Sequence, residues 1–122
     1  MMKKLLMEVG ELTDKEYARA NEQYPAFASD HEGHDVMTEE IEEAEEELEH
    51  IHSIEIAMKY AVRRNDAEDV NKTAMAMYET AQKMAAESIQ VAAMAQKIIE
   101  SRDLRRKKIW PALPMLKQEG GR

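Results

Sequence analysis

The chain has 122 residues, a net charge of −8 and no cysteine. The absence of cysteine excludes disulfides and thiolate metal sites, and it favours a cytoplasmic location. Aromatic residues make up 5% of the sequence, and no apolar stretch approaches the roughly 20 residues that span a bilayer, so we expect an all-α protein without a membrane partner.

The first predicted helix covers residues 14–23. Thr13 precedes Glu16 by three residues, which is the spacing of a capping box at a helix start. Pro25 follows Tyr24 and ends this helix. The next ten residues carry Ser, Asp and Gly without apolar periodicity, and they are predicted to form a loop.

The second and third predicted helices are long. Apolar residues recur at steps of three, four or seven over residues 36–63, and a 4-3-4-3 pattern without Gly or Pro continues over residues 66–100. Asn65 and Asp66 supply a turn and an N-cap between them. We therefore predict a helical bundle with two long antiparallel helices, completed by self-association. Residues 1–100 form a single domain, and residues 101–122 form a basic C-terminal extension that is partly disordered.

A dense acidic stretch follows the predicted loop, with eight glutamates between Glu39 and Glu49. A helical wheel places Glu40, Glu43 and Glu47 beside the apolar stripe, where partly buried carboxylates are expected. The opposite flank, away from the stripe, carries Glu42, Glu45, Glu46 and Glu49, for which exposure to solvent is a sufficient explanation. Glu39 lies between the two groups. Carboxylates three or four residues apart on one helix face can bind a hard divalent cation such as Mg²⁺ or Mn²⁺.

Glu87 is an isolated charge in an apolar helical segment. A carboxylate in such a setting needs a partner, because an unpaired charge away from water is costly. Gln90 follows one helical turn later and repeats the spacing of Glu40 and Glu43, so two facing helices could supply four oxygen ligands. Two interpretations stay open: a metal ion shared by both helices, or an ion pair with a basic side chain such as Lys83, Lys59 or Arg63.

Two short motifs resemble those of a known family. The sequence EEIEE at residues 39–43 resembles the E-E-x-x-E signature of MazG-like nucleotide pyrophosphohydrolases, including their small phage and prophage members. The sequence ESIQ at residues 87–90 resembles the family's second signature, E-x-x-D, with Gln90 at the Asp position. This resemblance covers about residues 31–99. It implies an all-α oligomer, a dimer or tetramer, that hydrolyses nucleoside triphosphates to the monophosphate and pyrophosphate.

The resemblance also implies roles for individual residues. Mg²⁺, or Mn²⁺ in its place, would be bound by Glu40, Glu43, Glu87 and Gln90. The catalytic carboxylates would be Glu39, Glu40 and Glu43. Because cations beside the phosphates offset the charge that develops in the reaction, the substrate phosphates would be bound by Lys72, Lys83 and Lys97.

Three other interpretations stay open. The chain could be a non-catalytic oligomeric scaffold or phage accessory protein, or a degenerate relative that binds nucleotide without cleaving it, which Gln90 favours. The basic run at residues 105–108 with Trp110 could instead bind nucleic acid. A basic helix end that complements the helix dipole or the acidic body is the simpler explanation, so nucleic acid is not expected as the main partner.

Overall fold

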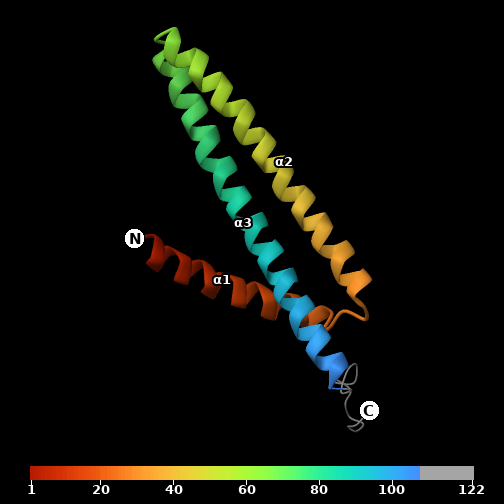
Figure 1. Cartoon of the computed structure of the whole chain (residues 1–122). Coiled ribbons are helices and arrows are strands. Elements are labelled where there is room, and N and C mark those ends of the chain that lie inside the picture. Colours follow the sequence, from red (N-terminus) through yellow and green to blue (C-terminus); the bar gives the residue numbers. More distant parts are fainter. Residues whose placement is uncertain (108–122) are drawn as a thin grey trace. The chain divides into compact units, whose positions relative to one another are not determined.

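The computed structural model describes residues 1–107, which form three helices (Figure 1). These helices are α1 (Met2–Gln23), α2 (Asp30–Arg63) and α3 (Ala67–Arg106). No strand occurs within residues 1–107, which confirms the predicted all-α class. The disorder predicted for the C-terminal end of the chain falls outside the described residues.

The chain divides into two compact units. The hairpin unit is Glu40–Ser88, and the core unit combines Met1–Glu39 with Ile89–Arg122, of which residues up to 107 are described. Within the hairpin unit, parts of α2 and α3 run antiparallel, as the sequence predicted. The single domain and the self-association predicted from the sequence stay predictions.

The turn between α2 and α3 was anticipated from its sequence. Asn65 has a positive φ of 58°, a left-handed conformation that Asn tolerates better than most residues. Its N–H donates to the Val62 carbonyl oxygen, and the Asp66 N–H donates to that of Ala61, which together close the end of α2. The Asp66 carboxylate then accepts the Asp69 N–H at 3.1 Å and caps the start of α3, which confirms the predicted N-cap.

α1 is longer than the sequence predicted, because it begins at Met2 and not at Asp14. The preceding segment consists mainly of good helix formers and lacks proline, so the cost of Gly10, about 1 kcal/mol, does not stop the helix. Thr13 is not a cap. Its Oγ1 donates to the Val9 carbonyl oxygen at 2.9 Å, a contact typical of a helix interior, so the predicted start was wrong.

α2 also begins earlier than predicted, at Asp30. Ser29 and Glu32 form a capping arrangement that the sequence prediction missed. Ser29 Oγ accepts the Glu32 N–H at 3.1 Å, and the Glu32 carboxylate accepts the Ala28 N–H at 2.6 Å. The predicted loop is therefore mostly the first turn and a half of a helix.

α3 extends further than predicted, to Arg106 rather than to about residue 100. No Gly or Pro occurs in the sequence between the start of α3 at Ala67 and Pro111. Arg105 and Arg106 lie in the last turn, where their charge complements the negative end of the helix dipole. The first residues of the predicted extension are thus part of the helix.

Phe27 lies at the centre of the core unit and is 5% exposed. It packs with Ala93 and Met94 of α3, and side chains of α1 and α2 cover this cluster. Gly33 of α2 lies very close to the cluster, because a Cβ at this position would be 2.8 Å from Ile98 Cγ1 and 3.0 Å from Phe27 Cδ2. The absence of a side chain at Gly33 is therefore a packing requirement.

The backbone of Phe27 is also held by α3. Its N–H donates to the buried Ser101 Oγ at 2.8 Å, and its carbonyl oxygen accepts a hydrogen bond from Arg105 at 2.7 Å. Both polar groups of a buried non-helical residue are thereby satisfied, which removes a cost of about 1–3 kcal/mol for each unpaired group. These contacts fix the segment between α1 and α2 against α3.

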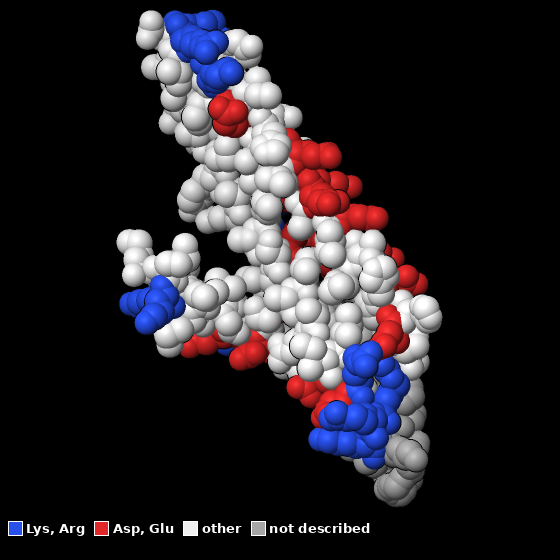
Figure 2. All heavy atoms as spheres, in the orientation of Figure 1, with Lys and Arg blue, Asp and Glu red and all other residues white. Residues whose placement is uncertain are grey.

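The hairpin unit has no comparable core. Its buried side chains are those of Ala61 and Glu47. Acidic side chains gather along α2, whereas Lys and Arg gather at the end of α3 (Figure 2). Five large apolar side chains of the hairpin unit are at least half exposed, namely Ile56, Tyr60, Val62, Met75 and Tyr78.

None of the described helices is long and apolar enough to cross a membrane.

Candidate metal-binding site

Three carboxylates converge in the hairpin unit. Glu40 and Glu43 lie one turn apart on α2, and Glu87 lies on α3. One carboxylate oxygen from each lies within 4.8 Å of the other two. Glu40 and Glu87 are half-buried and Glu43 is exposed. The antiparallel pairing thus brings together the acids that the sequence singled out from each helix.

The electrostatics of this group are unfavourable for three negative charges. Burial raises the pKa of Glu87, and hydrogen bonding to Glu43 with the negative charges of Glu43 and Glu47 raises it further. The positive charge of Lys83 acts in the opposite direction, as the smallest of these effects. A proton or a cation between the carboxylates would relieve the repulsion.

The competing interpretation was an ion pair between Glu87 and a nearby base. Within residues 1–107, no Lys or Arg nitrogen lies within 4.0 Å of the Glu87 carboxylate. Lys83 Nζ instead lies 3.5 Å from Glu47. Lys59 Nζ lies 5.9 Å from the centroid of the Tyr60 ring, and Arg63 Cζ lies 6.0 Å from it. The structure therefore favours the shared cluster over the ion pair.

Glu47 is the acid that the sequence prediction underrated. It is 8% exposed, and its carboxylate lies 3.5 Å from Lys83 Nζ and 3.6 Å from His50 Nδ1. Its position beside the apolar stripe was the signal for burial. Its partner could not be predicted, because the identity of the facing lysine depends on the register between α2 and α3.

Gln90 and Glu39 belong to the core unit, outside the three-carboxylate group. A hydrogen bond from Arg19 lowers the pKa of Glu16, burial opposes this, and hydrogen bonding to Gln90 adds a smaller lowering. Gln90 is thus in contact with Glu16, and its role as a fourth ligand stays a prediction. Glu39 is exposed, and its catalytic role also stays a prediction.

The three predicted phosphate-binding lysines occupy different settings. Lys72 is exposed on the hairpin unit, and Lys83 is the lysine whose charge acts on Glu87. Lys97 belongs to the core unit and is 4% exposed, packed against aromatic rings. Of the three, Lys83 is best placed to serve the carboxylate group.

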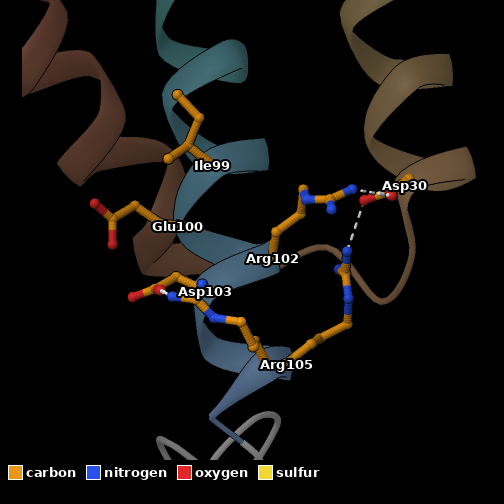
Figure 3. A pocket seen from close by; sticks show the side chains of 7 residues that line it. Asp30, Ile99, Glu100, Arg102, Asp103 and Arg105 are labelled. Atoms are coloured by element: carbon orange, nitrogen blue, oxygen red, sulfur yellow. Dashed lines mark hydrogen bonds and ion pairs between the residues drawn. The ribbon is translucent and has the colours of Figure 1, made fainter.

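A second charged cluster, which the sequence prediction missed, surrounds Asp30 in the core unit (Figure 3). The Asp30 carboxylate accepts hydrogen bonds from Arg102 at 2.6 Å and from Arg105 at 2.7 Å. These residues line a cavity of about 650 Å³. Because both arginines are already paired, the structure supports the simpler explanation, in which the basic end of α3 complements nearby acids.

The rest of the described basic run is paired in the same way. Arg106 is ion-paired with Asp103, and Lys107 Nζ lies 3.0 Å from the same carboxylate. Lys108 and Trp110, which completed the predicted nucleic-acid surface, lie outside the described residues. The described basic side chains of this run are therefore largely neutralised by acids of the core unit.

Comparison with protein families, with curated proteins and with solved structures finds no match to this chain. Its function must consequently be inferred from its own residues and their geometry.

Proposed function

We propose that the chain is a Mg²⁺-dependent nucleoside triphosphate pyrophosphohydrolase that releases a nucleoside monophosphate and pyrophosphate. The observation that carries this proposal is the convergence of Glu40, Glu43 and Glu87, each with an oxygen within 4.8 Å of the other two. Hard divalent cations prefer such oxygen ligands, and Mn²⁺ would fit the same donors. The motif resemblance at residues 39–43 and 87–90 supplies the reaction class.

The proposed reaction adds water to the α–β phosphoanhydride. The water oxygen bonds to phosphorus, the bridging P–O bond breaks, and pyrophosphate leaves as an anion while a carboxylate accepts the water proton. When bound, Mg²⁺ would polarise phosphate oxygens and lower the pKa of water. Glu43 suits the role of base, because it is the exposed member of the group and can reach solvent.

The remaining residues of the hairpin unit support this assignment through charge. Lys83 is paired with Glu47 at 3.5 Å, so its charge is held near the carboxylate group. A cation at this position would offset the negative charge of the substrate phosphates. Glu47, which is largely buried, would fix the lysine in place without contacting the substrate.

A coupled assay tests the proposal. Ribo- and deoxynucleoside triphosphates are incubated with Mg²⁺ or Mn²⁺, and pyrophosphate is converted to phosphate and detected. We expect Glu43→Gln and Glu87→Gln to lose roughly 100-fold or more in rate, because metal binding supplies several kcal/mol to the transition state. The matched control is Glu46→Gln. Glu46 is an exposed acid of α2 that lies outside the three-carboxylate group. Equal rates for Glu46→Gln and Glu87→Gln would overturn the proposal.

The exposed apolar side chains of the hairpin favour a second candidate, a non-catalytic oligomeric scaffold. Tyr60, Met75 and Tyr78 are each at least half exposed, and such side chains suit burial between two copies of the chain. A scaffold would form a dimer or tetramer by light scattering while showing neither turnover nor stabilisation by Mn²⁺. A degenerate relative would show Mn²⁺-dependent nucleotide binding without turnover.

A further inference from the structure

Lys97 is a buried cation in the core unit. It is 4% exposed, and its Nζ lies 4.7 Å from the centroid of the Phe27 ring and 5.9 Å from that of Tyr24. Among residues 1–107 it has no carboxylate within 4.0 Å and no hydrogen-bond acceptor. Aromatic faces stabilise a cation only in part, so the charge is incompletely neutralised.

Lys97 lines a pocket of about 380 Å³, which is in the size range of small-molecule sites. Apolar side chains of Ala20, Val36 and Met94 form part of its wall, with the rings of Tyr24 and Phe27. All of the lining residues belong to the core unit, and none is shared with the three-carboxylate group. The pocket also contains Gln90 and Lys97, to which the motif resemblance gave roles in binding the metal and the phosphates.

The other charged side chains of the pocket already have partners. Arg19 is ion-paired with Glu16, and the Glu32 carboxylate accepts the Ala28 N–H at 2.6 Å. Burial lowers the pKa of Lys97, and the charge of Glu32 acts against this from beyond ion-pair distance. Within residues 1–107, Lys97 is thus the charged side chain of this pocket that forms no ion pair or hydrogen bond.

We propose that this pocket binds a small organic carboxylate, with its acid group on Lys97 and its apolar body against Met94 and the aromatic rings. A monoanion is favoured over a phosphate, because Glu16 and Glu32 also line the pocket and would repel a second negative charge. Gln90 also lines the pocket and offers an amide to the second carboxylate oxygen.

Benzoate and its neutral analogue benzamide provide the test, because they share an aromatic body and differ in charge. Binding is followed by NMR in metal-free buffer, so that a cation bound by the three carboxylates does not contribute. We expect benzoate to bind at least roughly tenfold more tightly than benzamide, because a charge-assisted pair is stronger than a neutral hydrogen bond. Lys97→Met, which keeps an unbranched stem, should abolish this preference, and Lys72→Met should retain it.

A second measurement uses the wild-type protein and does not depend on the folding of Lys97→Met. The lysine Cε resonances are titrated with pH, with Glu16, Arg19, Glu32 and Tyr24 as the titratable groups that face the pocket. Benzoate should move the Lys97 titration to higher pH, because an adjacent anion favours the protonated amine. An unchanged titration, equal binding of benzamide, or no binding at about 10 mM benzoate would each overturn the proposal.

Discussion

The core unit and the hairpin unit differ in the burial of their apolar side chains and in the pairing of their charged side chains. In the core unit, Phe27 is buried with its backbone satisfied by Ser101 and Arg105, and Asp30 is paired with two arginines. In the hairpin unit, three carboxylates converge while large apolar side chains stay exposed. The comparison indicates that stability and the candidate site depend on different parts of the chain, which mutations can test separately.

The largest expected effect is the loss of the core aromatic ring. Phe27→Ala should lower the free energy of unfolding by about 3–5 kcal/mol, because it removes buried area and leaves a cavity beside Met94. Tyr78→Ala in the hairpin unit, where the side chain is 67% exposed, should change it by less than about 0.5 kcal/mol. Urea denaturation followed by circular dichroism measures both, and similar losses would contradict the assignment of the core to residues around Phe27.

The second prediction compares two helical glycines of the core unit. Gly33→Ala should destabilise the fold by about 1–3 kcal/mol, because the new Cβ would lie 2.8 Å from Ile98 Cγ1. Gly10→Ala meets no atom within 4 Å and should stabilise the fold by about 0.5–1 kcal/mol through helix propensity. Opposite signs in thermal melts would support the close approach of α2 and α3. A gain from both substitutions would show that the packing at Gly33 is loose.

Periodicity and spacing in the sequence predicted the features that depend on local pattern. The two long helices, the turn at Asn65 and the convergence of Glu40, Glu43 and Glu87 result from the 3.6-residue period and from a short connection that makes the helices antiparallel. The start of α1 was wrong, because a capping signature at Thr13 also fits a helix interior.

The features that the sequence did not predict depend on long-range contacts. The buried settings of Lys97 and Ser101 depend on how the segment around Phe27 folds back onto α3. The pairing of Asp30 with Arg102 joins residues far apart in the sequence, and no local pattern marks it. The partner of Glu47 likewise depends on the register of the hairpin.

The smallest expected effect is the pH dependence of the hairpin carboxylates without metal, because they are partly exposed and screened by solvent. The pKa of Glu87 is raised in the folded chain by burial and by Glu43 and Glu47. The contribution of the Glu87 carboxyl group to the free energy of unfolding is therefore fully present below the ordinary glutamate pKa. This contribution is lost as pH rises through the raised pKa. In EDTA, the wild type should lose stability over this range, whereas Glu87→Gln should lose less.

Mn²⁺ sharpens this last prediction. A cation that binds the folded carboxylates stabilises the fold in proportion to the logarithm of its concentration above its dissociation constant, about 2.7 kcal/mol at a hundredfold excess. Near neutral pH, Mn²⁺ should thus more than restore the stability that the wild type loses in EDTA, and it should stabilise Glu87→Gln less. Thermal melts between pH 4 and 8 measure the effect, with Glu46→Gln as the exposed control. If Glu87→Gln and Glu46→Gln share one pH slope and one Mn²⁺ response, the three acids are a solvated surface, and the hairpin unit does not carry the site.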